Sequence, residues 1–370
     1  MKNIFIIANT SWYIYNFRLS LIEKLQGSGY KVTVIAPFDD YSIKLENNGA
    51  YFLPISLNRK GLNPFLDLMV IVKLLFTFKS EKPDLVLTYT PKINIYASIA
   101  AHLLGIPVIN NISGLGTAFI RKNIITLIST VLYKSALSKS KKVFFQNNDD
   151  LKYFTDHKIV SNALAERIPG SGVDVDKFRP VDTKCNNGNF VFLLVARMLW
   201  DKGIGELIDA MKILKPEYPY IECQLLGFLD QGNPSAIPGE TLMQWEQEGV
   251  SKYLGSTDNV LEYMINADCI VLPSYREGVP RCLLEGASLA KPIITTDAVG
   301  CRDVVNDGVN GFLCRIKDSI DLADKMKKMI NMSAEEIGTM GSNGRKKMVA
   351  EFDEQTVIDR YMNQIGKYCN

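Results

Sequence analysis

Two cations in the second half of the chain have the spacing of an anion-binding pair. Arg197 and Lys202 lie five residues apart, between a short apolar run and a helical pattern. The free N–H groups at a helix N-terminus favour anions, so two cations beside them could hold a diphosphate. The alternative is a solvated loop in which Lys202 pairs with Glu206 on the helix. The residues alone leave both interpretations open.

Two carboxylates form a second constellation further along the chain. Glu277 should lie on the loop after a strand that ends at Leu272, and Glu285 on the helix behind it. Carboxylates accept hydrogen bonds from the paired hydroxyls of sugars and ribose, and Gly278 lets backbone N–H groups approach an anion closely. The alternative is a pair of surface carboxylates with no shared role.

The elements that must position these residues occur once in each half of the chain. Each half opens with a short apolar run, a polar loop, a helical pattern and a second apolar run. This pattern is typical of buried parallel strands joined by crossover helices, so we predict an α/β protein with two Rossmann-like domains. Ligands of such sheets bind beyond the carboxyl ends of the strands, and we expect the two domains to face each other across a cleft. The segments are Ile4–Ala8, Asn9–Asn16, Phe17–Leu25 and Val32–Ala36, then Phe190–Ala196, Arg197–Gly203, Ile204–Leu214 and Ile221–Leu226.

The alternation of apolar runs and helical patterns is interrupted in a segment that ends at Pro180, and we predict the domain boundary there. The expected domains are residues 1–180 and 181–350, and residues 351–370 are expected to form a helix that packs back on the first domain. Asp174 and Asp176 have the spacing of a metal-binding pair, but they fall in the predicted linker, where acidic turn residues are ordinary. We therefore expect no metal site.

The composition argues against several classes of protein. The longest apolar stretch, residues 62–78, is broken by Asp67 and Lys73, whereas a membrane span needs about 20 apolar residues. The apolar run that follows Met1 is too short for a signal peptide. The seven cysteines include no C-x-x-C pair and are interpreted as small core residues. We expect a cytoplasmic protein.

Positive charge is concentrated in the first half of the chain. Residues 1–180 carry 22 lysines and arginines against 13 acidic residues, a net charge of +9, whereas residues 181–370 have a net charge of −7. A basic half could attract nucleic acid, anionic lipid or phosphorylated substrates. Cations beside an apolar helical face suit anionic lipid, and no aromatic platform for nucleic acid accompanies them; a solvated basic face is the alternative. The residues assigned to a membrane surface are Arg121, Lys122, Lys139, Lys141 and Lys142.

Together the two constellations resemble the family 4 glycosyltransferases, retaining enzymes of the GT-B fold that use nucleotide sugars. In that family an Arg-x4-Lys pair follows the first strand of the second domain, and a Glu-x7-Glu element follows a later strand. The resemblance implies that Arg197 and Lys202 bind the donor diphosphate and act in catalysis. It implies that Glu285 binds the ribose and that Glu277 is a catalytic residue on the transferred sugar. The other donor-binding residues that it implies are Tyr253, Leu254, Gly278, Val279 and Arg281.

The first half is similar to a narrower branch, the bacterial enzymes that add N-acetylhexosamines to undecaprenyl-diphosphate-linked sugars. The similarity lies in residues 11–18, 62–65 and 114–116. Two features depart from the family pattern: the glycine pair usual in the first loop is absent, and the histidine common near residue 113 is a serine. The acceptor-binding residues that the resemblance implies are Thr10, Ser11, Asn16, Arg18, Ser113, Gly114 and Gly116.

The resemblance also implies a reaction and its partners. The expected enzyme moves an N-acetylhexosamine, with N-acetylgalactosamine as first choice, from a UDP-sugar to a lipid-diphosphate-linked sugar in bacterial glycan assembly. It needs neither a metal nor another cofactor, binds no nucleic acid and is peripheral on an anionic membrane surface, at the inner face of the cell membrane. Two alternatives stay open: a GT-B sugar-nucleotide epimerase, and a non-catalytic protein that binds nucleotide sugars at a membrane surface.

Overall fold

The structure is a computed structural model, and the residues that it describes are 1–57, 64–114, 124–181 and 188–369. The contacts within the chain divide it into two compact units. Unit 1 contains Met1–Ser171 and Gln355–Asn370, and unit 2 contains Gly172–Glu354. The sequence set the boundary at Pro180. The residues just before that proline belong to unit 2 because Val173 is part of its hydrophobic core.

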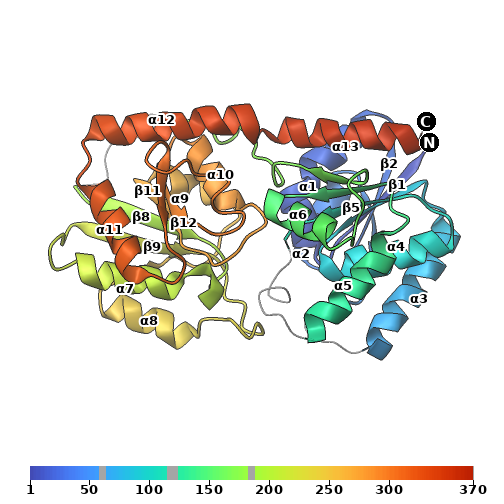
Figure 1. Cartoon of the computed structure of the whole chain (residues 1–370), viewed down its shortest axis with the longest axis horizontal. Helices are drawn as coiled ribbons and strands as arrows, with labels where there is room; N and C mark the ends of the chain where they lie inside the picture. Colours follow the sequence, from blue (N-terminus) through green and yellow to red (C-terminus); the bar gives the residue numbers. More distant parts are fainter. Residues whose placement is uncertain (58–63, 115–123, 182–187, 370) are drawn as a thin grey trace. The chain divides into compact units, whose positions relative to one another are not determined.

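Unit 1 is built on a seven-stranded sheet in the order β3-β2-β1-β4-β5-β6-β7 (Figure 1). Every pair of neighbouring strands is parallel. The central strands are buried along their whole length. Because both faces of a parallel sheet are covered, these strands appear in the sequence as continuous apolar runs. The strands are β1 (Asn3–Ile7), β2 (Lys31–Ala36), β3 (Tyr51–Pro54), β4 (Leu85–Tyr89), β5 (Val108–Ile112), β6 (Lys142–Phe145) and β7 (Ala165–Arg167).

Helices cover both faces of this sheet. One core cluster joins one face to α3, α4, α5 and α6, and a second joins the other face to α1, α2 and α13. Among the described residues, no helix is long and apolar enough to cross a membrane. The helices are α1 (Ser11–Gly27), α2 (Asp40–Asn47), α3 (Pro64–Glu81), α4 (Pro91–Leu103), α5 (Ile124–Leu137), α6 (Asn148–Asp156) and α13 (Glu354–Cys369).

Helix α1 begins earlier than the sequence predicted. Residues 9–16 were expected to form a polar loop, but the helix starts at Ser11. The hydroxyl of Thr10 accepts a hydrogen bond from the Tyr13 N–H at 3.0 Å, and threonine is a favourable residue at this capping position. The polar side chains therefore complete a helix terminus, and this part of the prediction is wrong.

The helical pattern near the end of the chain is interrupted once. The sequence predicted a helix over residues 351–370; in the structure α12 ends at Glu351 and α13 begins at Glu354. Between them, Phe352 is 1% exposed and packs in the core of unit 2, and its carbonyl accepts the Val173 N–H at 2.9 Å. After this anchor the chain returns to unit 1, where α13 completes one of the two core clusters.

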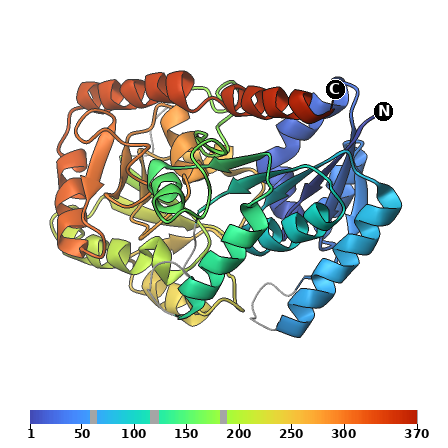
Figure 2. The same cartoon turned by 45° about the vertical axis from the view of Figure 1, so that its right-hand side comes forward.

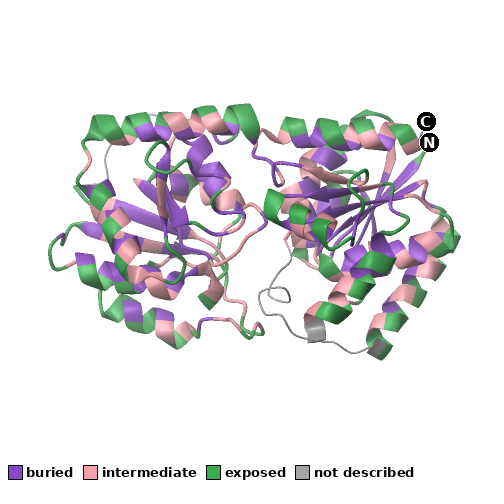
Figure 3. Cartoon of the chain, viewed as in Figure 1, coloured by how far each residue is buried: buried purple, intermediate pink, exposed green. Residues whose placement is uncertain are grey.

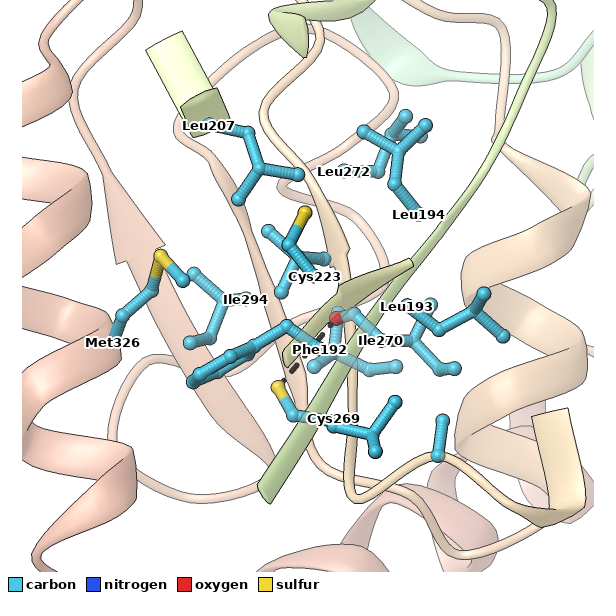
Figure 4. Packing of buried hydrophobic residues seen from close by; sticks show 14 of the residues in the cluster. Phe192, Leu193, Leu194, Leu207, Cys223, Cys269, Ile270, Leu272, Ile294 and Met326 are labelled. Atoms are coloured by element: carbon cyan, nitrogen blue, oxygen red, sulfur yellow. Dashed lines mark hydrogen bonds between the residues drawn. The ribbon is translucent and has the colours of Figure 1, made fainter. Parts of the chain in front are cut away.

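Unit 2 contains a six-stranded parallel sheet in the order β10-β9-β8-β11-β12-β13. Its core packs Phe192, Leu207, Cys223, Ile270 and Met326 between the sheet and its helices (Figure 4). The cysteines among the described residues are free, and all but one are buried. The strands are β8 (Phe190–Val195), β9 (Ile221–Leu226), β10 (Lys252–Tyr253), β11 (Cys269–Leu272), β12 (Ile293–Thr296) and β13 (Gly311–Cys314). The helices are the 3-10 helix η2 (Trp200–Lys202), α7 (Ile204–Leu214), α8 (Gly239–Gln247), α9 (Val260–Ile265), α10 (Arg281–Ser288), α11 (Ser319–Ile330) and α12 (Ala334–Glu351).

Tyr361 is one of the α13 residues that pack against the sheet of unit 1. Tyr361 on α13 is 1% exposed, and its ring centroid lies 4.8 Å from that of Phe144 on β6. Its hydroxyl accepts a hydrogen bond from the Asn111 side chain at 2.8 Å. Both the apolar body and the polar tip of this tyrosine are therefore satisfied inside unit 1.

We predict that Tyr361→Ala destabilises unit 1 by about 3–5 kcal/mol, because it leaves a large cavity and the buried Asn111 amide without its partner. Asn363→Ala, at an exposed position of the same helix, should change stability by less than about 0.5 kcal/mol. Urea unfolding followed by circular dichroism measures both variants. A loss below about 1 kcal/mol for Tyr361→Ala would show that α13 contributes little to the stability of unit 1.

Candidate active site

Loops that follow neighbouring strands meet at the carboxyl edge of the sheet in unit 2. Strand β8 pairs with β11, and β11 with β12, so the loops after these three strands are adjacent. Two glycines allow them to touch through their backbones. A Cβ atom on Gly203 would lie 2.0 Å from the carbonyl oxygen of Pro273, and one on Gly300 would lie 2.3 Å from that of Gly278. No other residue fits either position without moving a loop.

These contacts bring the two sequence constellations together at Lys202 and Glu277. The Lys202 Nζ atom lies 2.5 Å from Glu277 Oε1, and both side chains are largely covered, with exposures of 14% and 17%. The Ser274 hydroxyl lies 2.8 Å from the same carboxylate oxygen. The Glu277 N–H donates to the Val299 carbonyl at 3.0 Å, which fixes the backbone that carries the carboxylate. One loop thus holds the cation and two others hold its partner.

The charge on Lys202 is stabilised within this arrangement. Burial by itself lowers the pKa of the ammonium, but the adjacent Glu277 carboxylate raises it, and the net shift is upward from the ordinary value of 10.5. Lys202 therefore stays protonated throughout the neutral range. A permanent cation at this edge of the sheet is what an anionic ligand requires.

The alternative pairing of Lys202 with Glu206 is not present. Glu206 on α7 instead accepts a hydrogen bond from the Tyr275 hydroxyl at 2.6 Å. The Tyr275 N–H in turn donates to the Asp201 carbonyl at 3.0 Å. These two bonds join the loop after β11 to the loop and helix after β8. They strengthen the framework around Lys202 without using its charge.

Arg197 is the most exposed cation of the candidate site. It precedes η2 on the same loop as Lys202, and its side chain is 45% exposed. The guanidinium Nη1 atom lies 3.2 Å from Asp230 Oδ2, on the loop after β9. An exposed pair of this kind contributes little to stability, so the guanidinium can exchange its partner at low cost.

Glu285 lies on α10, as predicted, and Glu277 lies on the loop before that helix. Arg281, one turn earlier on α10, donates from Nε to Glu285 Oε1 at 2.8 Å. Glu285 is 8% exposed, and burial raises the pKa of its carboxyl group, although Arg281 opposes the shift. A carboxylate that accepts a hydrogen bond from Arg281 at one oxygen retains capacity to accept further hydrogen bonds.

The remaining predicted donor-binding residues lie at the same edge of the sheet. Strand β10 pairs with β9, and the Tyr253 hydroxyl donates to the Gly227 carbonyl at 2.9 Å. The Leu254 N–H donates to the Leu225 carbonyl at 2.9 Å. Gly278 is buried and Val279 half-buried, and both directly precede α10.

The predicted acceptor-binding residues of unit 1 have different local roles. Thr10 caps α1, and the Asn16 side chain donates to the Trp12 carbonyl at 2.9 Å on the same helix. Ser11 is fully buried, its hydroxyl 2.8 Å from the Pro37 carbonyl oxygen and 2.9 Å from the Ser42 hydroxyl. We therefore leave Ser11 out of any ligand surface. Half-buried Ser113 and Gly114 follow β5, and Gly116 lies outside the described residues.

Arg18 is buried among aromatic rings in unit 1. It is 3% exposed, and its guanidinium lies 4.5 Å from the ring centroid of Tyr89 and 5.9 Å from that of Tyr361. Its Nη2 atom donates to the Tyr13 hydroxyl at 3.3 Å, whereas Nε has no hydrogen-bond partner among the described residues. The tyrosine faces stabilise the cation by cation–π attraction and leave its hydrogen-bonding capacity incompletely used.

Three of the predicted membrane-surface residues are described by the structure. Lys139 and Lys141 are exposed after α5, whereas Lys142 pairs with Glu166 at 2.8 Å and its side chain is 15% exposed. Arg121 and Lys122 lie outside the described residues.

Sequence reasoning missed the groups that support the charged residues. Ser274, Tyr275 and Asp230 act through contacts with other loops, and Tyr361 contacts Arg18 from a helix far along the chain. Spacing along one segment holds no signal for such contacts. The neighbouring strands were visible in the sequence, but which of them pair was not.

No group of three or more histidine, cysteine or acidic side chains with the geometry of a metal site occurs in the described part of the chain. The predicted linker aspartate Asp174 accepts the N–H groups of Asp176 and Lys177 at 3.0 and 2.8 Å. Its carboxylate stabilises the local turn, in the way usual for aspartate.

Two α/β units with parallel sheets, one of them with a cationic site on its strand-to-helix loops, define the GT-B class of fold. The chain is similar to Anabaena Alr3699/HepE in complex with UDP and glucose, with a TM-score of 0.80 and 19% identity, covering 99% of this chain and 100% of that one. It is also similar to sucrose-phosphate synthase from Thermosynechococcus elongatus, with a TM-score of 0.78 and 16% identity, covering 99% and 98%. These likenesses establish the fold.

Each half of the chain matches a model of a glycosyltransferase family. The model for glycosyl transferases group 1 matches residues 176–347, and the model for glycosyl transferase 4-like proteins matches residues 3–147. Both models describe glycosyltransferases, and together they match most of the chain; it is therefore a glycosyltransferase, an enzyme of the hexosyltransferase type.

Characterised relatives match along most of the chain. The Campylobacter jejuni N,N'-diacetylbacillosaminyl-diphospho-undecaprenol alpha-1,3-N-acetylgalactosaminyltransferase is 26% identical, covering 94% of each chain. The Staphylococcus aureus capsular polysaccharide biosynthesis glycosyltransferase CapM is 28% identical, covering 91% of this chain and 90% of the relative. The Escherichia coli UDP-Gal:alpha-D-GlcNAc-diphosphoundecaprenol alpha-1,3-galactosyltransferase is 24% identical, covering 84% and 82%.

We predict that Glu285→Gln raises the melting temperature of the ligand-free protein at neutral pH. Because the folded pKa of Glu285 lies above its ordinary value of 4.5, ionised Glu285 destabilises the fold above that pH, and the penalty disappears below it. The difference between variant and wild type should therefore grow from pH 4 to pH 7 in thermal unfolding. A lower melting temperature at pH 7 would contradict this account.

Glu217→Gln is a control for which we expect a change in melting temperature of the opposite sign. The hydrogen bond from Lys327 lowers the pKa of the Glu217 carboxyl group, so its contribution is present above its ordinary pKa and is lost as pH falls. This variant should melt slightly below wild type at pH 7 and together with it at low pH.

Proposed function

We propose that this glycosyltransferase moves an N-acetylhexosamine, with N-acetylgalactosamine as first choice, from a UDP-sugar to a lipid-diphosphate-linked sugar, with retention of anomeric configuration. The observation that carries the proposal is the contact between Lys202 and Glu277. It joins two motifs that lie 75 residues apart in the sequence, and the family resemblance assigns both motifs to one donor site.

The charges of unit 2 suit the donor nucleotide. Lys202 is a permanent, largely covered cation, and Arg197 is an exposed one on the same loop. We assign the diphosphate to these two side chains. Glu285 is buried and accepts from Arg281, so we assign it the ribose hydroxyls, and Glu277 the transferred sugar. Backbone groups near Tyr253 and Leu254 are assigned to the base.

The proposed reaction balances without a metal. The bond between the anomeric carbon of the donor sugar and the β-phosphate oxygen breaks, and the acceptor hydroxyl oxygen bonds to the same carbon on the same face. The acceptor proton passes to the leaving phosphate oxygen. Negative charge therefore grows on UDP, and preorganised cations stabilise it; each such group can contribute roughly 3–4 kcal/mol to the barrier reduction.

The names of the relatives support the proposed acceptor. The Campylobacter and Escherichia enzymes are named for undecaprenol-linked diphospho-sugars, and they match 94% and 84% of this chain. In unit 1, Arg18 offers a buried cation with an unused Nε donor. We assign Arg18, with the loop at Ser113 and Gly114, to the diphosphate-linked acceptor.

The assay that tests this function combines UDP-N-acetylgalactosamine, UDP-N-acetylglucosamine and UDP-galactose in turn with a polyprenyl-diphosphate-linked sugar. We expect one of the N-acetylhexosamines to appear in an α linkage by NMR, in the presence of EDTA. Donor alteration without transfer indicates an epimerase, and binding without turnover indicates a non-catalytic protein. Loss of transfer in EDTA that Mg²⁺ or Mn²⁺ restores would show that the reaction needs a metal.

We predict that Lys202→Ala or Arg197→Ala lowers turnover by at least about 100-fold, because each removes charge stabilisation that is needed most in the transition state. Lys212→Ala is the control, since Lys212 is an exposed lysine of the same unit that pairs with Glu248. It should retain full activity. Steady-state kinetics, with melting temperatures to confirm folding, decide the outcome. Activity within about threefold of wild type in both site variants would refute the diphosphate assignment.

A further inference from the structure

Helix α3 is apolar on two opposite faces. Its inner face packs Val70, Leu74 and Phe78 into the core of unit 1. A second apolar row occupies its outer face at the spacing of one helical stripe, with exposures between 41% and 70%. The residues of this row are Phe65, Leu68, Met69, Val72 and Phe76.

Helix α5 repeats the arrangement. Its inner face packs Tyr133, Ala136 and Leu137 into the same core. Its outer face carries apolar residues that are between 39% and 64% exposed. The residues of this second row are Leu127, Ile128, Val131 and Leu132.

The two rows belong to one side of unit 1. Helix α4 contacts both α3 and α5, so the three helices form one layer, and exposed residues follow the outer side of that layer (Figure 3). In both cartoon views the first turns of α3 and α5 lie at the same end of the unit (Figures 1 and 2). Each of these helices follows the carboxyl end of a strand, so the apolar rows lie toward the edge of the sheet where Ser113 and Gly114 are found. We call the two rows together the outer apolar face.

The charges around the outer apolar face are suited to an anionic surface. Asp67, in the first turn of α3, is 18% exposed and pairs with Lys92 on α4 at 3.1 Å. Helix α5 contains no acidic residue. The exposed cation Lys73 lies between Val72 and Phe76 of the α3 row, and the exposed cation Lys134 follows the α5 row. Lysines at such positions extend their charge to lipid headgroups while their stems stay on apolar surface.

The lysines predicted from the sequence as membrane contacts do not lie on the outer apolar face. Lys139 and Lys141 follow the end of α5, beyond the apolar row at residues 127–132, and Lys142 is paired with Glu166. Membrane binding through the predicted basic surface alone would be reversed by salt. Exposed apolar side chains gathered on one side of a unit instead mark a surface that a membrane or a partner protein covers.

We propose that the outer apolar face of α3 and α5 inserts into the interface of an anionic bilayer, with Lys73 and Lys134 at the headgroups. The proposal rests on the proposed function, because a polyprenyl-linked acceptor stays in the bilayer. Insertion at this end of unit 1 brings the membrane surface to the edge of the sheet that holds the candidate acceptor loop. The contact combines apolar burial with electrostatic attraction.

Vesicle sedimentation tests the insertion directly. The full chain should bind phosphatidylglycerol-containing vesicles and bind pure phosphatidylcholine vesicles at least about tenfold more weakly. Salt at about 1 M, where the screening length is near 3 Å, should leave a measurable part of the binding because the apolar term remains. Phe65→Ser/Phe76→Ser and Leu127→Ser/Val131→Ser should each weaken binding by at least about tenfold.

Ile213→Ser/Ile320→Ser is the matched control. It removes two apolar side chains of unit 2 that are 51% and 66% exposed, and it should bind vesicles like the wild type. Lys73→Glu/Lys134→Glu should abolish the preference for phosphatidylglycerol. Circular dichroism and melting temperature confirm that each variant is folded.

Activity separates this proposal from the proposed function. With a soluble short-chain diphosphate-linked acceptor, the apolar variants should keep wild-type turnover, and with a long-chain acceptor in vesicles they should lose at least about tenfold. Equal losses on both acceptors, or unchanged vesicle binding, would overturn the insertion and leave the transferase assignment intact. Self-association in ultracentrifugation that the apolar substitutions abolish would assign the face to a second copy of the chain and also overturn it.

Discussion

Contact between the backbones of neighbouring loops is the constraint on which the charged site of unit 2 depends. Gly203 and Gly300 leave no room for a Cβ atom, so the loops after β8, β11 and β12 lie against one another. Side chains that are 75 residues apart in sequence then meet at 2.5 Å. The contacts of the sheet and its loops therefore determine the position of Lys202. Such preorganisation is what electrostatic catalysis needs, because little rearrangement is left for the reaction itself.

The cations Lys202, Arg281 and Arg197 each have a carboxylate neighbour. Lys202 faces Glu277, Arg281 faces Glu285, and Arg197 reaches Asp230. These pairs keep covered charges from being isolated, which would be strongly unfavourable. They also mean that an incoming anion competes with protein carboxylates for its cations. The exposed pair at Arg197 yields easily, whereas the covered pair at Lys202 is held by Ser274 and by fixed backbone.

The sequence was most informative where one local pattern determines the structure. The bounds of β9 and α7 and the end of β11 were predicted from short, mainly apolar segments and a helical stripe, and they agree with the structure. The two charged motifs were found because each lies on one continuous segment that follows a strand. The start of α1 was missed because a capping threonine makes polar residues helical. The pairing of Arg197 with Asp230 and the outer apolar row of α3 could not be predicted in this way. Both depend on which elements pack together, and a linear sequence pattern does not contain that information.

The return of α13 to unit 1 has a consequence for synthesis of the protein. Unit 2 is one continuous segment, whereas unit 1 consists of two segments separated by all of unit 2. On the ribosome, the sheet of unit 1 is complete long before Tyr361 emerges, and one of its core clusters stays uncovered during translation of unit 2. Unit 2 can finish folding first, although it is made second. The nascent chain thus exposes apolar surface for an extended period. Chaperones that recognise exposed apolar surface are expected to bind it during this period.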